Sequence, residues 1–130
     1  MPAMEKILGP HRATIFALLR IAAGFLFMQH GLPKLFGGFG RPAPAELMSQ
    51  MGLAGIIEVI GGALIALGLF TSPVAFIASG EMAVAYFQAH FPRDYWPIVN
   101  GGELAALFCF VFLYFAAVGS GKWSIDSLRK

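Results

Sequence analysis

Residues 53–89, LAGIIEVIGGALIALGLFTSPVAFIASGEMAVAYFQA, contain two apolar runs with only three residues between them. The first run covers 53–70, the second covers 74–89, and the tripeptide TSP separates them. A helix needs roughly 20 residues to cross the hydrocarbon of a bilayer, and both runs approach that length. A connection this short makes the two helices antiparallel neighbours. The sequence therefore predicts a helical hairpin inserted in a membrane.

Two further apolar runs flank this hairpin, at 13–32 and 101–118. The whole chain of 130 residues is 58% hydrophobic and 12% charged, with a mean hydropathy of +0.73, which argues against a soluble domain. The expected fold is all-α: one domain over 1–130, a bundle of four transmembrane helices. A short helix lying in the interface is expected at 45–51, after the first span.

Basic residues predict the orientation. One side of the bundle carries five of them and the other side three, which favours both termini in the cytoplasm. The five are Lys6, Arg12, Lys122, Arg129 and Lys130, and the three are Lys34, Arg41 and Arg93. The expected location is a membrane that the chain crosses several times, with the lipid bilayer as partner.

Charge and cysteine content exclude several functions. A net charge of +2 with dispersed Lys and Arg does not suit a nucleic-acid surface. Cys109 is the single cysteine, so the chain forms no internal disulfide and no Cys-x-x-Cys redox pair. Any redox chemistry must use a bound cofactor or one supplied by a partner.

Four ionisable residues fall within the expected spans: Arg20, Glu58, Glu81 and Glu103. A charged side chain at the centre of a bilayer costs about 2.5 to 3.5 kcal/mol on insertion scales, so each needs a partner or a change of protonation. Arg20 and Glu81 lie at similar depth, and an ion pair between them is expected. At 100° per residue, each of the four shares a face with small or aromatic residues, and these faces are expected to point inward.

Helical periodicity places several candidate pocket residues near the outer ends of these helices. A cavity open to the outer side is expected among Glu58, Glu103, His30, Asn100 and Gln88. His90 falls nearly opposite Glu81 if the third helix is regular, which argues against a role in the core.

Structural alternatives exist for most of these residues. The pair of Arg20 and Glu81 can simply lock the bundle, and Asn100 with Glu103 is a variant of the capping box. Lys34 can extend to the lipid headgroups. Two histidines invite a bis-histidine haem, but the angular position of His90 argues against it. The absence of a Glu-x-x-His pair argues against a metal site.

Five motifs in this order resemble the DoxX family of small bacterial membrane proteins. They are the His-Gly-x-x-Lys end of the first span, EVIGGALIALG at 58–68, GEM at 80–82, NGGEL at 100–104 and GSGKWSID at 119–126. The resemblance implies four transmembrane helices in the inner membrane of a bacterium and a component of a membrane redox system. Members of this family bear names such as quinol oxidase subunit and thiosulfate:quinone oxidoreductase subunit. No catalytic residue is transferred from the family to this chain.

The leading hypothesis is a membrane subunit of a redox system that binds quinone or quinol in a polar pocket. His30 with Arg20 or Lys34 would donate hydrogen bonds to the quinone, and Glu58 and Glu81 would relay protons. The catalytic candidates are Glu58, Glu81 and Arg20, and the binding candidates are His30, Lys34, Glu103, Asn100 and Gln88. Redox-enzyme subunits and a second copy of the chain are the expected protein partners. The alternative is a non-catalytic membrane scaffold, or a transport protein for a small solute or protons.

Overall fold

The computed structural model describes residues 2–41 and 43–129, which contain helices and loops but no strand. Pro42 and Lys130, the latter counted for the orientation, lie outside the described residues. The elements are α1 (Pro2–Leu8), η1 (Gly9–His11), α2 (Arg12–Phe36), α3 (Gln50–Leu67), α4 (Thr71–Ala85), the π-helix η2 (Tyr86–His90), η3 (Phe91–Arg93), α5 (Pro97–Asn100), α6 (Glu103–Val118) and α7 (Ile125–Leu128).

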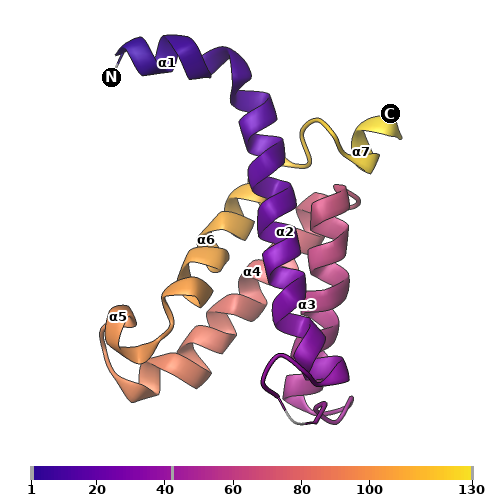
Figure 1. Ribbon diagram of the computed structural model, residues 1–130, viewed down its shortest axis with the longest axis vertical. Coiled ribbons are helices and arrows are strands. Elements are labelled where there is room, and N and C mark those ends of the chain that lie inside the picture. The colour runs from indigo at the N-terminus through magenta and orange to yellow at the C-terminus, as the bar shows by residue number, and fades with distance from the viewer. Residues whose placement is uncertain (1, 42, 130) are drawn as a thin grey trace.

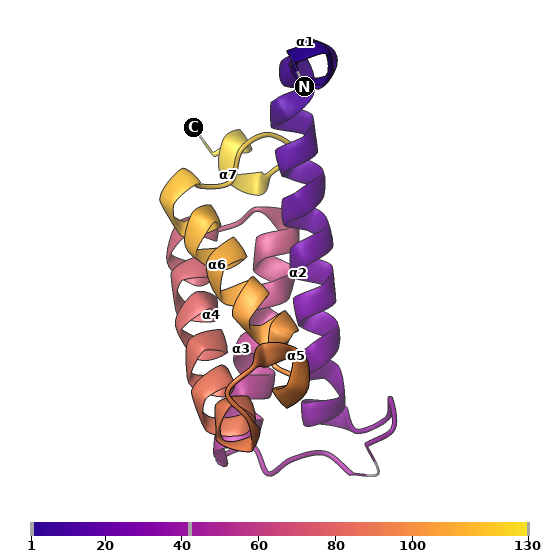
Figure 2. The ribbon, with the colours of Figure 1, turned by 90° about the vertical axis from the view of Figure 1, so that its left-hand side faces the viewer.

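Four longer helices, α2, α3, α4 and α6, run side by side (Figures 1 and 2). The helices α2 and α3 form one closely packed pair, and α4 and α6 form the other. The contact between α3 and α4 is smaller than either of these. Helix α1 bends away from the axis of α2 (Figure 1), and both termini lie at the same end of the molecule (Figures 1 and 2). The expectation of an all-helical protein is confirmed.

Two helical segments have the length and hydropathy needed to cross a membrane. They are 2–36, which includes α1 and α2, and 50–67, which is α3. Helix α6 is equally apolar in character but shorter, and α4 continues into the π-helix η2. The predicted apolar runs therefore correspond to helices, with boundaries shifted by a few residues.

Glycines let α2 and α3 approach closely. A Cβ added to Gly24 would lie 2.7 Å from the carbonyl oxygen of Gly62, and a Cβ on Gly62 would lie 2.6 Å from that of Gly24. Real Cβ atoms do not come this near to backbone, so both positions require glycine. Small residues at a helix crossing are the usual means of bringing backbones together in a membrane.

Aromatic rings fill the space between the two helix pairs. Phe27 of α2 and three rings of α6, Phe108, Phe112 and Phe115, are buried, and Phe27 lies 4.7 Å from Phe112 between ring centroids. The predicted inward face of α6, which includes Glu103, is wrong. Residues on that face are exposed because burying the three rings removes more apolar surface than burying a face led by a carboxylate.

The expected interfacial helix at 45–51 is also absent. Residues 43–49 form turns, and α3 begins at Gln50. Ser49 is the N-cap: its hydroxyl accepts a hydrogen bond from the backbone N–H of Gly52 at 3.1 Å. A serine in this position ends the preceding loop and starts the helix, so the turns before it do not become helical.

Candidate functional site

A cleft of about 910 Å³ lies between α3 and α4, whose mutual contact is smaller than that within either closely packed pair. Its walls are mostly apolar, and its polar side chains are Lys34, Ser49, Gln50, Glu81, Gln88 and His90. Among the apolar residues are Leu53, Ala54, Ile57, Ile77, Val84 and Ala85. An apolar cavity with a few polar groups is the usual form of a small-molecule site.

Lys34 and Glu58 form an ion pair beside this cleft. The Nζ atom of Lys34 lies 2.7 Å from one carboxylate oxygen of Glu58 and 2.8 Å from the other. The Glu58 side chain is fully buried, whereas that of Lys34 is 24% exposed. Gly31 permits the contact, because a Cβ there would lie 2.8 Å from the Glu58 Cβ. The expectation that Lys34 extends to the headgroups is therefore wrong.

Glu81 reaches the same place from α4. Its carboxyl lies within hydrogen-bonding reach of Glu58 and close to the charge of Lys34. The Oε1 atom is buried, and no donor among the described residues contacts it. Burying a polar atom without a partner costs free energy, so this carboxyl needs either a proton of its own or a donor from a bound molecule.

The π-helix η2 brings two more polar residues to the cleft. A π-helix makes wider turns than an α-helix, so residues after it fall on a different face. His90, expected opposite Glu81, lines the cleft with it, as does Gln88. The side chain of Gln50, at the start of α3, donates a hydrogen bond to that of Gln88. A π-turn leaves little trace in a single apolar sequence, and periodicity alone therefore misplaced His90.

Asn100 holds the π-helix in position. Its side-chain amide donates to the Tyr86 hydroxyl at 3.2 Å and to the Asp94 carbonyl at 3.0 Å. Its backbone carbonyl lies 3.3 Å from Nδ1 of His90. Because a carbonyl only accepts hydrogen bonds, Nδ1 carries the hydrogen, and Nε2 of a neutral His90 is an acceptor. Asn100 is thus placed behind the cleft wall rather than in the cavity.

Arg20 does not pair with Glu81, and that expectation is corrected. The guanidinium is fully buried at the opposite end of α2. All three of its nitrogens donate to backbone carbonyls, including that of Ile65 at 3.0 Å, Ser120 at 2.5 Å and Trp123 at 2.6 Å. Five donors in a planar fork suit several carbonyls at once. The arginine joins α2 and α3 to the segment that follows α6.

His30 and Glu103 lie outside the cleft. Both are exposed, and the His30 ring packs edge-on against Phe108 at 6.1 Å. The suggested capping box does not form, because Gly102 is the N-cap of α6 and no side chain caps it. Instead, the Asn100 side-chain oxygen accepts from the Gly102 N–H at 2.7 Å.

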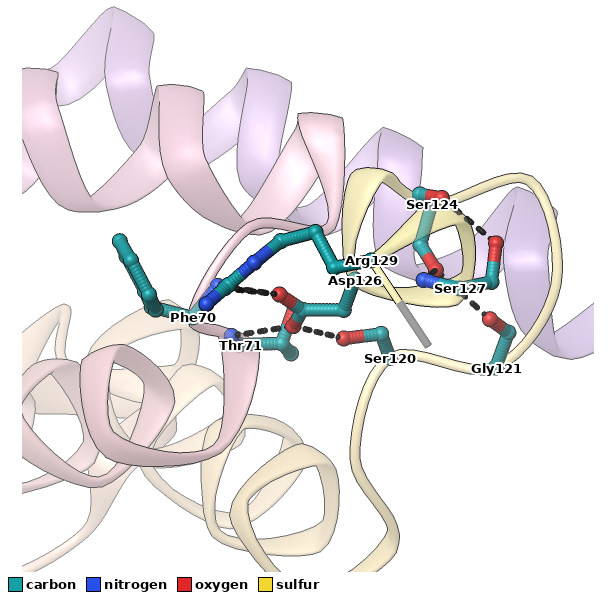
Figure 3. Close-up of polar contacts among 8 residues, drawn as sticks. All are labelled: Phe70, Thr71, Ser120, Gly121, Ser124, Asp126, Ser127 and Arg129. Carbon is teal, nitrogen blue, oxygen red and sulfur yellow. Dashed lines mark hydrogen bonds and ion pairs between the residues drawn. The ribbon is translucent and has the colours of Figure 1, made fainter.

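Asp126, for which the sequence indicated no role, caps α4 from a distant part of the chain (Figure 3). Its carboxylate accepts hydrogen bonds from the Phe70 N–H at 3.0 Å, the Thr71 N–H at 3.2 Å and the Ser120 hydroxyl at 2.5 Å. The Ser120 hydroxyl, the Phe70 and Thr71 amides and the Arg129 charge lower the pKa of Asp126 to about 2. The GSGKWSID motif at 119–126 includes Ser120 and Asp126, but the sequence does not indicate what these residues contact.

Comparison with known proteins places the cleft within a recognised family domain. The family model described as DoxX matches residues 15–91, which include Lys34, Glu58 and Glu81. A Haemophilus influenzae protein, described as uncharacterized, is 40% identical over 130 residues, covering 92% of this chain and 94% of that protein. An uncharacterized membrane protein of Mycobacterium tuberculosis is 23% identical over 144 residues, covering 96% of this chain and 87% of that protein. No solved structure matches the chain.

Proposed function

This chain belongs to the DoxX family and is a membrane protein, and from this premise we propose that it binds a quinone or quinol in the cleft between α3 and α4. The bundle of α2, α3, α4 and α6 crosses the bacterial inner membrane four times in this proposal. The mouth of the cleft then faces lipid, from which a lipid-soluble ligand enters. The protein serves as the quinone-binding subunit of a redox system, with electrons supplied or taken by a partner.

The chemistry of the cleft supports a quinone head group. A quinone needs hydrogen-bond donors at its carbonyl oxygens and apolar surface against its ring. Lys34 uses two contacts for Glu58, and an ammonium group has three N–H donors, so one donor remains. The amide of Gln88 is a second donor. Arg20 and His30 are not part of the proposed site. Arg20 donates its hydrogen bonds to backbone carbonyls, and His30 packs against Phe108 outside the cleft.

The observation that carries this proposal is a largely apolar cavity with a partly exposed ammonium group at its edge. In lipid surroundings such a group is costly unless it has partners, so a free donor there is more readily explained by a ligand than by packing. When bound, the quinone supplies the redox chemistry. The chain's own residues hold its head group and exclude water.

Gly80 offers a direct test, because a Cβ added there meets no atom within 4 Å and the residue lines the cleft. In Gly80→Leu the new side chain takes up part of the cavity, and its Cβ meets no neighbouring atom. Decyl-ubiquinone titrated into protein in lipid nanodiscs should bind saturably to the wild type. Gly80→Leu should weaken that binding at least about tenfold, equivalent to about 1.4 kcal/mol.

The matched control is Ala117→Leu, an exposed position on α6 outside the cleft, which should bind like the wild type. Absence of saturable binding, or equal affinity of the Gly80→Leu variant, rules out the cleft as a quinone site.

A scaffold or transport protein is the second candidate, and the ion pair of Lys34 and Glu58 favours it. That pair links α2 to α3 through a fully buried carboxylate, as a structural lock would. Native complexes isolated in mild detergent separate the two functions. A scaffold retains its partner proteins in Gly80→Leu and carries no quinone, whereas a quinone subunit carries quinone that Gly80→Leu loses.

A further inference from the structure

Two carboxyl groups meet beside the cleft with one cation between them. Both oxygens of Glu58 accept from the ammonium of Lys34, at 2.7 and 2.8 Å. The carboxyl of Glu81 lies within hydrogen-bonding reach of that same carboxylate. One positive charge balances one carboxylate, so the second carboxyl would leave a net charge of −1 in apolar surroundings.

The contact between Glu58 and Glu81 requires a hydrogen atom. An ionised carboxylate only accepts hydrogen bonds, and two facing carboxylates repel, more strongly in a medium of low dielectric constant. The Oε1 atom of Glu81 is buried and has no donor among the described residues. Glu58 is fully buried, so water does not separate the two groups at its side.

We infer that Glu81 holds a proton and donates it in a hydrogen bond to Glu58, so that Lys34, Glu58 and Glu81 form a neutral proton-binding site. The charge count then closes with one ammonium, one carboxylate and one carboxylic acid. The charged groups beside Glu81 are Lys34 from α2 and Glu58 from α3, and His90 from η2 lines the same cleft.

The cleft gives this proton a route. Glu81 and His90 both line it, and Nδ1 of His90 is bound to the Asn100 carbonyl, which leaves Nε2 to accept. The cleft is thus the side from which a proton can reach or leave Glu81, and His90 is a second proton-accepting group along it. This site does not depend on the ligand, because its three groups are present in the protein alone.

Infrared spectroscopy of the protein in liposomes, without added quinone, tests the inference. A protonated carboxyl in apolar surroundings has a C=O band that an ionised one lacks, and the band shifts when H₂O is replaced by D₂O. The wild type should show this band, and Glu81→Gln should lose it. Glutamine keeps a donor toward Glu58, so the variant should melt within a few degrees of the wild type. Glu103→Gln, which removes an exposed carboxyl, should keep the band.

A second measurement covers the case in which Glu81→Gln does not fold. Dicyclohexylcarbodiimide reacts with protonated carboxyls in apolar surroundings, and mass spectrometry of the wild type should find the adduct on Glu81. A wild type without the band, or a folded Glu81→Gln that retains it, overturns the proton site. Labelling that spares Glu81 does the same. None of these results bears on quinone binding, so the two proposals fail separately.

Discussion

Losing Lys34 alone should destabilise the protein more than losing Lys34 and Glu58 together. Removing Lys34 leaves a fully buried carboxylate without its cation, whereas removing both leaves an apolar contact. We expect Lys34→Met to lower the free energy of unfolding by roughly 2 to 4 kcal/mol, somewhat less than for a fully buried pair because Lys34 is partly exposed. The double variant Lys34→Met/Glu58→Met should return to within about 1 kcal/mol of the wild type.

Thermal and denaturant unfolding in detergent measure both effects. Glu103→Met is the control, because this exposed carboxylate forms no ion pair among the described residues. Its stability should change by less than about 0.5 kcal/mol. If the double variant is as unstable as the single one, the unpaired Glu58 carboxylate is not the cause of the instability of Lys34→Met.

At the residue level, the sequence indicated which residues are buried better than it indicated their partners. The pattern of glycines and charges placed Arg20 and Glu58 on inward faces, and both are fully buried. The ion pair was assigned to Arg20 and Glu81 because depth along two helices was the only available criterion. Depth does not indicate how the helices are rotated relative to each other, nor where the carbonyl groups of a loop lie. Carbonyl groups of the loop after α6 accept the hydrogen bonds of Arg20.

At the level of elements, close packing of α2 against α3 rests on glycine. Gly62→Ala should destabilise the protein by about 1 to 3 kcal/mol, because its Cβ would lie 2.6 Å from the Gly24 carbonyl oxygen and the helices would have to separate. Gly80→Ala is the matched control on α4, where the Cβ meets no atom within 4 Å. It should leave stability unchanged or raise it by up to about 1 kcal/mol through helix propensity. Thermal unfolding in detergent compares the stability of the two variants. Equal losses of stability would mean that the close contact between α2 and α3 is not what requires glycine at position 62.

The cap that α7 provides to α4 gives the protein a dependence on acidic pH. The pKa of Asp126 is lowered to about 2, so its stabilising effect is complete above the ordinary pKa of about 4 and is lost as the pH falls toward 2. Asp126→Asn should cost about 1 kcal/mol at neutral pH, because the amide lacks the negative charge beside the N-terminus of α4 and keeps only one of the two acceptor oxygens. It should also flatten the loss of stability between pH 4 and pH 2. Unfolding followed across that range checks both effects, and parallel curves for the two proteins would exclude Asp126 as the titrating group.

Elements that depend on local signals were predicted well, and those that depend on distant ones were not. The apolar runs predicted the helices, because length and hydropathy are local properties. The inward face of α6 was wrong because it was chosen by its single charge, whereas three phenylalanines decide it. The π-helix η2 depends on its contact with Asn100, and the cap by Asp126 depends on its contact with Phe70. The periodicity of apolar residues does not indicate either contact.

For the whole molecule, the arrangement of charge bears on its orientation in the membrane. α1 and α7 lie at one end of the bundle, and the loop residues 37–41 and 43–49 lie at the other together with α5 (Figure 2). Lys34 was counted as a basic residue of the second end, but its charge is balanced by Glu58. Arg129 of the first end is paired in the same way with Asp126, at 3.3 Å, so each end has one paired cation among the described residues and the excess of basic residues at the first end is unchanged.

We expect a membrane-impermeant maleimide to label opposite ends of the bundle from opposite sides. In a Cys109→Ser background, Ala43→Cys in the loop should react in intact spheroplasts, and Ser127→Cys in α7 should react only after the membrane is opened, since both residues are exposed in the protein. Four crossings also require Ala3→Cys, in α1, to behave like Ser127→Cys, because an even number of spans returns the chain to its starting side. If Ala3→Cys and Ser127→Cys react from different sides, one of the four helices does not cross. The shorter α6 is then the first to examine, because it has 16 residues against the roughly 20 that a span needs.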